Sequence, residues 1–315
     1  MKCTLKSYNG LKSHEKGVDS RMASTTLFRK VVVLGYGKVT GEVLQYVYNR
    51  QSEYGYELVF IEHEVHALSV TEKICRDNDI LFHRIPDKKE LARFLDRIGE
   101  KALIVSASNN FLFPASLVEK PHITIINFHN ALLPAYPGRN APTWVIYKGE
   151  ERTGITWHYV TAGVDEGNII VQKECRITED MKAYELTQCL MDLAAEAFRE
   201  SFADILAECA RTREQGFDSD RHMYRSSEVP AGGRLDLADK PEKIYRILRS
   251  VDYGKNAIFP PMRTVIDGRE AEILRYRKIS EDKYKAGEGL AYLPLENGEV
   301  LKIKYRYMDD KTGLT

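Results

Sequence analysis

Short apolar runs alternate with amphipathic stretches through the first half of the sequence, and this alternation limits the fold more than any other feature. Runs typical of buried strands stand at 29–34, 58–62, 80–84, 102–106 and 123–126. Helix-like stretches follow the first three runs and end near Asn49, Asp77 and Arg97. Strands that alternate with helices predict an α/β fold with a mostly parallel sheet and helices on both faces.

A Rossmann-like sheet of this kind places its ligand beyond the carboxyl ends of the strands, where the strand order reverses. The segments 107–114 and 127–138 both follow strand runs, so we expect them to be neighbours in one crevice. Gly35, Gly37 and Gly41 follow the first run, but their spacing departs from G-x-G-x-x-G. A tight strand-to-helix turn is therefore favoured over a nicotinamide cofactor, for which Glu62 is the candidate ribose-binding acid.

The chain beyond residue 150 predicts two more strands, at 153–160 and 169–176, joined by a turn that contains Asp165. A long amphipathic helix follows, with Thr178 as its expected N-cap and with Glu179 and Asp180 in its first turn. We expect the apolar face of this helix to pack in the hydrophobic core.

Polar sequence containing glycine and proline at 211–238 predicts a linker, which gives a first domain over 28–210 and a small C-terminal domain over 239–315. The C-terminal domain is expected to be β-rich and barrel-like, because short strand runs alternate there with glycine-containing turns. Residues 1–27 are polar without apolar periodicity. We expect either a disordered leader or an upstream start, with Met22 as the true beginning.

Composition narrows the class of protein. The 315 residues include 46 Lys and Arg and 46 Asp and Glu, so no global field favours DNA, other nucleic acid or a membrane surface. No apolar run approaches the ~18 residues of a membrane span. The five cysteines form no C-x-x-C pair, which indicates reduced thiols, a cytoplasmic location and no metal site. The oligomeric state is not indicated.

The stretch from Asn127 to Asn168 gathers chemically useful side chains. Asn127 and His129 stand two residues apart after a strand run, so they face the same side of an extended chain. A loop broken by prolines follows, and Asp165 then stands in a glycine-flanked turn. Singly, each residue is typical of a strand end, a structural histidine or a turn. Together, an amide donor, an imidazole and a carboxylate around one loop favour acyl-group chemistry.

The ordered motifs of this stretch resemble those of the formyltransferase superfamily, which uses 10-formyltetrahydrofolate as co-substrate. The matching pieces are Asn127-x-His129, Leu132-Leu133-Pro134, Tyr136-x-Gly138, Thr153-Gly154-x-Thr156-x-His158 and Val164-Asp165-x-Gly167 with Ile170. The resemblance covers roughly residues 29–210 and implies that 28–210 is the catalytic domain. It also implies a catalytic trio of Asn127, His129 and Asp165.

The chemistry of formyl transfer agrees with the trio. Attack of an amine on the formyl carbon gives a tetrahedral intermediate with an oxyanion, and Asn127 can donate a hydrogen bond to that oxygen. His129 can also donate to it or carry protons near neutral pH. Asp165 can orient His129 or accept the amine proton. We expect His158 to support the Asp165 loop.

The resemblance further implies that main-chain groups of two loops bind the pterin. These loops contain Asn110, Phe111 and Leu112 in one case, and Thr161, Ala162, Gly163 and Val164 in the other. For Phe111 and Leu112, ordinary core packing is the competing interpretation.

The acceptor is expected to be a small-molecule amine, such as an amino-sugar nucleotide or an amino acid. The segment Gly138-Arg139-Asn140-x-Pro142-x-Trp144 resembles sugar-nucleotide and specialised-metabolite N-formyltransferases, and Arg139 and Asn140 would bind the acceptor. Formylation of methionyl-tRNA is the alternative, for which Lys302, Lys304, Arg306 and Lys311 hint at a basic surface. A 10-formyltetrahydrofolate hydrolase or a non-catalytic folate-binding module is a further alternative.

Overall fold

The computed structural model describes residues 26–64, 69–216, 221–285 and 287–309. Most of the expected leader and Lys311 lie outside these residues. The chain divides into two compact units. The first comprises Met1–Pro137, Gly154–Cys175 and Cys189–His222, and the second comprises Gly138–Thr153, Arg176–Gln188 and Met223–Thr315. Two short segments within the expected first domain, 138–153 and 176–188, thus group with the C-terminal part of the chain.

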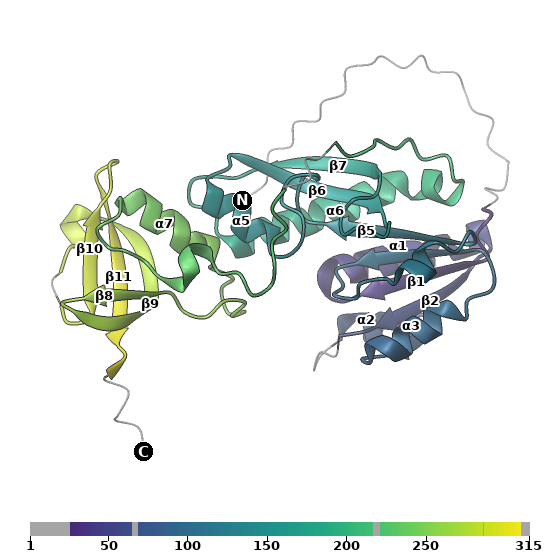
Figure 1. The fold of residues 1–315 in the computed structure, drawn as a ribbon, viewed down its shortest axis with the longest axis horizontal. Coiled ribbons are helices and arrows are strands. Elements are labelled where there is room, and N and C mark those ends of the chain that lie inside the picture. Colours follow the sequence, from purple (N-terminus) through teal and green to yellow (C-terminus); the bar gives the residue numbers. More distant parts are fainter. Residues whose placement is uncertain (1–25, 65–68, 217–220, 286, 310–315) are drawn as a thin grey trace, which may run out of the picture. The chain divides into compact units, whose positions relative to one another are not determined.

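A seven-stranded sheet in the order β3-β2-β1-β4-β5-β6-β7 confirms the expected α/β architecture (Figure 1). Its strands are β1 (Lys30–Gly35), β2 (Glu57–Glu62), β3 (Leu81–Arg84), β4 (Ala102–Ala107), β5 (Ile123–His129), β6 (Arg152–Tyr159) and β7 (Ile169–Arg176). The pairs from β3 to β5 are parallel, whereas β5 and β6 are antiparallel. The strand order reverses between β1 and β4, so the carboxyl ends of β4 and β5 lie at the position where such sheets bind ligands.

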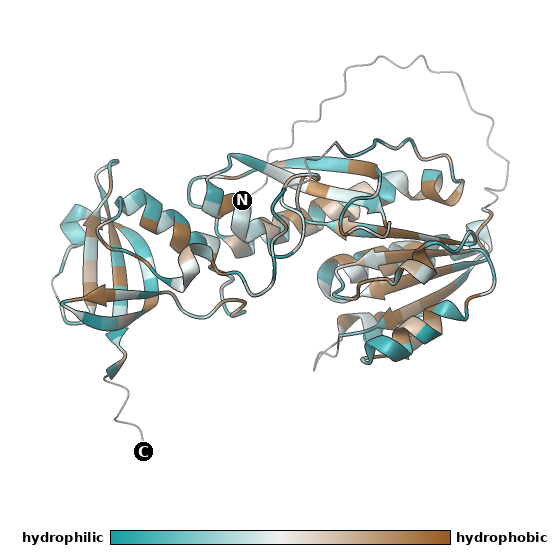
Figure 2. Cartoon of the chain, in the orientation of Figure 1, coloured by the Kyte–Doolittle hydropathy of each residue, from teal (hydrophilic) through white to brown (hydrophobic). Residues whose placement is uncertain are grey.

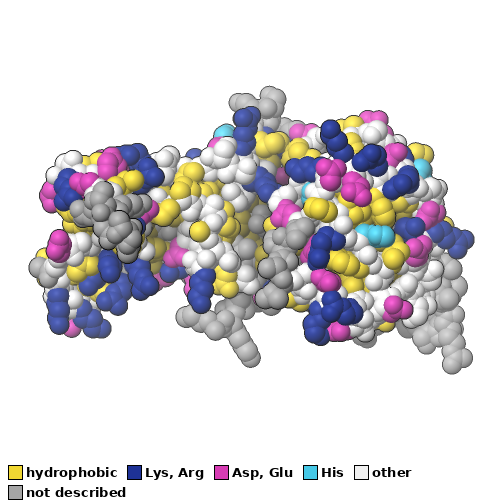
Figure 3. Space-filling view, turned by 90° about the horizontal axis from the view of Figure 1, so that it is seen from below, with side chains coloured by type: hydrophobic (Ala, Val, Ile, Leu, Met, Phe, Trp, Pro, Cys, Tyr) yellow, Lys and Arg dark blue, Asp and Glu magenta, His cyan; other side chains and the backbone are white. Residues whose placement is uncertain are grey.

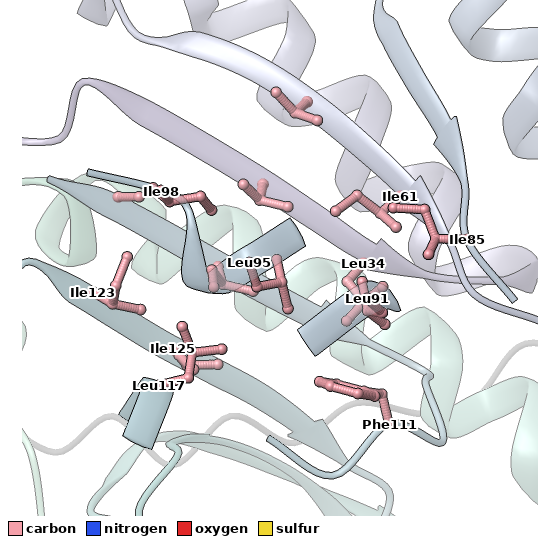
Figure 4. Packing of buried hydrophobic residues seen from close by; sticks show 14 residues of the cluster. Leu34, Ile61, Ile85, Leu91, Leu95, Ile98, Phe111, Leu117, Ile123 and Ile125 are labelled. Atoms are coloured by element: carbon pink, nitrogen blue, oxygen red, sulfur yellow. The ribbon is translucent and has the colours of Figure 1, made fainter. Parts of the chain in front are cut away.

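Helices surround the strands of this sheet. They are α1 (Gly37–Tyr54), α2 (Val70–Asp77), α3 (Lys88–Asp96), α4 (Ala115–Val118) and α6 (Ala183–Leu206). Figure 4 shows Leu91 and Leu95 of α3 packed against Leu34 and Ile125 of the sheet. Trp157 of β6 packs on Phe198 of α6. Figure 2 shows that the central strands are the most hydrophobic part of this unit, as expected for a sheet buried on both faces.

The second unit contains a curled antiparallel sheet, which confirms the expected β-rich C-terminal part. The sheet order is β10-β11-β9-β8. The strands are β8 (Arg263–Ile266), β9 (Arg269–Ser280), β10 (Leu290–Pro294) and β11 (Glu299–Tyr307), and the helices are α5 (Ala141–Lys148), η1 (Pro230–Gly233), α7 (Pro241–Ser250) and η2 (Glu281–Lys283). Ile244 and Leu248 of α7 pack with Leu301 and Ile303 of β11 into a separate core.

The expected N-terminus of the long helix was wrong. Helix α6 begins at Ala183, five residues after the predicted cap at Thr178. Glu179 and Asp180 instead bind Lys278 of β9, at 2.8 and 2.6 Å. Long-range ion pairs therefore hold this segment outside the helix, and its local capping signal is overridden.

At the first glycine turn, the ends of β1 and β4 approach each other closely. Gly35 has φ +152°, and a Cβ atom there would lie 1.9 Å from the carbonyl oxygen of Ala107. Glu62, the candidate ribose-binding acid, is fully buried and accepts hydrogen bonds from Ser69 Oγ at 2.5 Å and Arg84 Nε at 2.9 Å. Its carboxylate is thus held by the protein itself, and the structure favours the tight-turn interpretation. No helix among the described residues is long and apolar enough to cross a membrane.

Candidate active site

The carboxyl ends of β4 and β5 bring the first site residues together. Ser106 pairs in register with Asn127, which confirms that the segments after β4 and β5 are neighbours. Because β6 runs antiparallel to β5, His158 lies directly opposite Asn127, and Thr156 lies opposite His129. His129 and His158 are both buried, and Asn127 is half-buried.

The turn after β6 places the Asp165 carboxylate between two imidazole rings. Oδ2 lies 3.5 Å from His129 Nδ1, and Oδ1 lies 3.6 Å from His158 Nε2. The side chain of Asp165 is only 10% exposed, and its backbone has φ +56°. The structure therefore brings all three expected catalytic side chains together.

Backbone carbonyl groups determine which ring nitrogen of each histidine carries a proton. His129 Nε2 lies 2.8 Å from the Tyr136 carbonyl oxygen, and His158 Nδ1 lies 2.8 Å from that of Tyr159. A carbonyl oxygen only accepts hydrogen bonds, so both of these nitrogens donate. His129 consequently presents Nδ1 to Asp165, where a proton can pass between ring and carboxylate.

The amide of Asn127 is held from both sides. Ser106 Oγ donates to its Oδ1 at 2.6 Å, and its Nδ2 lies 3.2 Å from His158 Nε2. An amide nitrogen only donates, so in this contact His158 Nε2 accepts one N–H of Asn127. The other N–H of Nδ2 has no protein acceptor in the described part of the chain, and it can be offered to a ligand oxygen.

Residues beyond β7 brace the Asp165 turn. Gln215 Nε2 donates to the carbonyl oxygens of Asp165, at 3.0 Å, and Gly167, at 2.6 Å. Arg221 binds the carbonyl oxygen of Val164 at 3.3 Å. A Cβ atom at Gly167 would lie 1.8 Å from the carbonyl oxygen of Tyr159, which explains the glycine in this turn. Gln215 and Arg221 belong to the segment that the sequence predicted as a linker.

Some polar groups of the loop after β4 are already hydrogen-bonded within the protein. The Asn110 side chain donates to the Glu64 carboxylate, and the backbone N–H of Phe111 donates to Asn109 Oδ1. The Phe111 ring is 6% exposed and packs edge-on against Phe113, whereas Leu112 is 73% exposed. Core packing, the competing interpretation, thus describes the Phe111 side chain but not that of Leu112.

The second expected folate loop follows β6. Thr161 and Ala162 are exposed, while Gly163 and Val164 are half-buried beside the Asp165 turn. Thr161 Oγ1 donates to the Gly163 carbonyl oxygen at 3.4 Å. The N–H of Val160, just before the loop, binds the Ile125 carbonyl oxygen at 2.8 Å, which fixes the start of the loop to β5.

Arg139 and Asn140, the expected acceptor-binding residues, belong to the second unit. Arg139 is exposed, and its backbone N–H binds the Tyr224 carbonyl oxygen at 2.9 Å. Asn140 has φ +58° and precedes α5. Among the described residues, no group of three His, Cys, Asp or Glu side chains is arranged to hold a metal ion.

Sequence reasoning missed several residues of the site. His158 was expected to support the Asp165 loop, but its ring contacts Asp165 and Asn127 directly. Ser106, Gln215 and Arg221 carried no local signal. Ser106 could have been found only from the register of β4 on β5, because that register places Ser106 directly beside Asn127.

Three comparisons with known proteins agree with this geometry. The family model described as "Formyl transferase" matches residues 29–201. A methionyl-tRNA formyltransferase of Clostridioides difficile (strain 630) is 28% identical over 188 residues, 59% of this chain and 60% of that protein. A methionyl-tRNA formyltransferase of Acetivibrio thermocellus is 36% identical over 122 residues, 38% of this chain and 39% of that protein. The chain thus matches less than two thirds of these relatives' length.

A solved structure of similar fold is the sugar 3N-formyl transferase WlaRD, with a TM-score of 0.66, 15% identity and coverage of 89% of this chain and 98% of that one. An N-formyltransferase from Helicobacter canadensis, in complex with folinic acid and dTDP-3-aminofucose, has the same TM-score and identity and is covered completely. At these identities the likeness concerns the fold. The family match extends over more than half of the sequence and contains the whole trio, and on this basis the chain belongs to the formyl transferase family.

Proposed function

We propose that the protein transfers the formyl group of 10-formyltetrahydrofolate to the amine of a small acceptor. The observation that carries this proposal is the Asp165 carboxylate 3.5 Å from His129 Nδ1, beside an Asn127 amide with one N–H to offer. Asn127 and His129 stand at the carboxyl end of β5, beside that of β4, where α/β sheets bind their ligands.

In the proposed reaction the acceptor nitrogen attacks the formyl carbon and forms a new C–N bond. The carbonyl electron pair moves to oxygen, and Asn127 donates to this oxyanion, an interaction typically worth about 3 kcal/mol. Asp165, directly or through His129, takes the proton that the amine loses. When the intermediate collapses, the bond from carbon to N10 of the folate breaks, and N10 receives a proton. The products are the N-formyl acceptor and tetrahydrofolate.

Backbone groups of the loops at Asn110–Leu112 and Thr161–Val164 bind the pterin in this proposal. The first loop follows β4, whose end pairs with Asn127, and the second ends at Asp165, which contacts His129. Titration with 5-formyltetrahydrofolate, a stable mimic, tests this step. Saturable binding is expected, and absence of binding at millimolar ligand would contradict the folate assignment.

The small-amine acceptor is supported by sequence and by fold. Gly138-Arg139-Asn140 resembles the sugar-modifying branch, and the solved structures of similar fold include a sugar 3N-formyl transferase and an N-formyltransferase in complex with dTDP-3-aminofucose. A screen of amino-sugar nucleotides and amino acids with 10-formyltetrahydrofolate should find an acceptor that turns over much faster than methionyl-tRNA. Arg139→Ala should raise the KM for this acceptor and leave folate affinity unchanged, because a charged group at this position acts on the acceptor.

A second candidate acceptor, methionyl-tRNA, is favoured by a basic face of the C-terminal sheet. Arg277 pairs directly with Lys302, and Arg275 pairs with Lys304. Directly opposed residues point to the same face of a sheet, and like charges there are unfavourable unless an anion binds them. Arg306, also expected to be basic surface, is instead bound to Glu272 at 3.0 Å. Figure 3 shows Lys and Arg side chains gathered on the surface of this unit.

Arginine and lysine substitutions distinguish the two acceptors. If methionyl-tRNA is the substrate, the double variant Arg277→Ala, Lys302→Ala should raise its KM and make that KM less dependent on salt, because fewer phosphates are neutralised, whereas Arg139→Ala should not. Lys88→Ala, Lys89→Ala on α3 is the matched control for a loss of two exposed charges. Efficient formylation of methionyl-tRNA at physiological salt, unaffected by Arg139→Ala, would overturn the small-amine acceptor.

A further inference from the structure

We propose that Ser106 and Asn109 are positioning residues that set the orientation of the Asn127 amide and tie it to the loop after β4. This inference rests on the proposed role of Asn127 as the oxyanion donor. It adds two residues that contact no reacting atom but determine which face of the amide the substrate meets.

Four groups form a directed chain of hydrogen bonds. Asn109 Nδ2 donates to Ser106 Oγ, and Ser106 Oγ donates to Asn127 Oδ1 at 2.6 Å. Asn127 Nδ2 then donates to His158 Nε2 at 3.2 Å. The direction follows from the amide atoms, because the nitrogens of Asn109 and Asn127 only donate and Asn127 Oδ1 only accepts.

The direction of this chain decides what Asn127 can do. An amide turned by 180° would place its oxygen toward the site, where it would repel a developing oxyanion. Ser106 opposes this turn, because a flipped amide would take away Asn127 Oδ1, the acceptor to which the buried Ser106 hydroxyl now donates. Ser106 is fully buried, so no bulk water can replace its hydroxyl as donor.

Asn109 extends the same constraint to the loop after β4. Its Oδ1 accepts the backbone N–H of Phe111, so one side chain binds both Ser106 and the loop proposed to hold the pterin. Ser108, which precedes Asn109 in the chain, has φ +60°, a conformation that a non-glycine residue seldom adopts. Movement of this loop is therefore transmitted to the Asn127 amide through two hydrogen bonds.

The test is a double-mutant cycle in which the release of tetrahydrofolate from 10-formyltetrahydrofolate is measured. Each variant is assayed with the amino-sugar nucleotides and amino acids of the acceptor screen (the amine panel) and with water alone. Ser106→Ala should lower kcat by about tenfold, the effect of one neutral hydrogen bond, and leave the Kd of 5-formyltetrahydrofolate within about twofold. In an Asn127→Ala background, the same substitution should leave kcat unchanged, since no amide remains to be oriented. Asn109→Ala, at a half-buried position, should show a weaker form of the same pattern.

Ser250→Ala is the matched control, because Ser250 is equally buried and donates to the Ile247 carbonyl oxygen at 2.7 Å. It should lower thermal stability without changing kcat. Equal losses of kcat from Ser106→Ala in both backgrounds, or no loss in the wild-type background, would overturn the proposal.

The Asn127 side-chain amide signals in a ¹H–¹⁵N spectrum, assigned by their loss in Asn127→Ala, give a readout that needs no turnover. Ser106→Ala should shift these signals and accelerate their exchange with solvent, while Ser250→Ala should not. If the spectra behave so but the wild type consumes no 10-formyltetrahydrofolate, the proposed function fails and the orientation of Asn127 by Ser106 stands. Unchanged Asn127 signals in Ser106→Ala would refute that orientation.

Discussion

Replacing Gln215 by alanine removes two hydrogen bonds that hold the Asp165 turn and changes no proposed catalytic side chain. Both N–H bonds of its Nε2 are used, one to the Asp165 carbonyl oxygen at 3.0 Å and one to that of Gly167 at 2.6 Å. Asp165 is held at φ +56°, a conformation that costs an aspartate on the order of 1 kcal/mol. The turn therefore depends on bonds from outside it.

The magnitude follows from these contacts. Two neutral hydrogen bonds contribute about 2 kcal/mol together, but Gln215 Oε1 is buried without a hydrogen-bond partner among the described residues, which offsets part of this. A net loss of about 1.4 kcal/mol in the free energy that holds the turn corresponds to a tenfold change in the equilibrium between the held and the released turn. We expect Gln215→Ala to lower kcat by about tenfold, because Asp165 leaves its position beside His129. Gln215→Glu should lower it further, since a carboxylate would face two carbonyl oxygens.

Steady-state formyl transfer and thermal unfolding measured on the same preparations test this expectation. Gln45→Ala on α1 is the matched control, since Gln45 is also half-buried and its amide also donates a hydrogen bond, to Asn49 at 3.1 Å. A kcat of Gln215→Ala within about twofold of the wild type would refute the reasoning. A loss of kcat equal to that in Gln45→Ala would do the same.

Three further predictions concern single groups. Asn127→Ala should lower kcat by about 10²–10³ with little change in folate affinity, because the oxyanion exists only after attack; near-normal turnover would remove its assigned role. Burial raises the pKa of the Cys75 thiol to about 12, so an alkylating agent at pH 8 should modify exposed Cys209 and spare Cys75, as read by mass spectrometry. Burial opposes ionisation of Asp252, but the hydrogen bonds from Lys182, Tyr276 and the Gly254 N–H, together with the charge of Lys182, outweigh it and lower the pKa of this carboxyl. Its stabilising effect is full above about pH 4 and is lost as the pH falls through the lowered value, so Lys182→Met should flatten the decline of Tm in acid; an unchanged slope would contradict this.

Much of the fold could be predicted because its signals are local. The bounds expected for the strand at 169–176 agree with those of β7, since a glycine-containing turn marks the start of this strand. Thr178 shows the limit of local signals: its cap was overridden by Lys278, about a hundred residues away in the chain. Local pattern carries no information about such a partner.

The site was predictable only in part, for the same reason. Asn127, His129 and Asp165 were found because their motif is ordered along the chain, and the structure brings them together. Ser106 reaches Asn127 through the register of two parallel strands, and Gln215 reaches Asp165 across 50 residues. Neither contact follows from residue type or spacing, because each depends on how separate elements pack.

The most direct test of the central claim follows the formyl group itself. The wild type and Asn127→Ala are incubated with 10-formyltetrahydrofolate labelled in the formyl carbon and with the amine panel, and label and tetrahydrofolate are quantified together. We predict that label appears on an amine in equal amount to tetrahydrofolate, and that Asn127→Ala abolishes most of this transfer. Label recovered only as formate would indicate a hydrolase, and no consumption of the folate would indicate a binding module; either result would contradict the account.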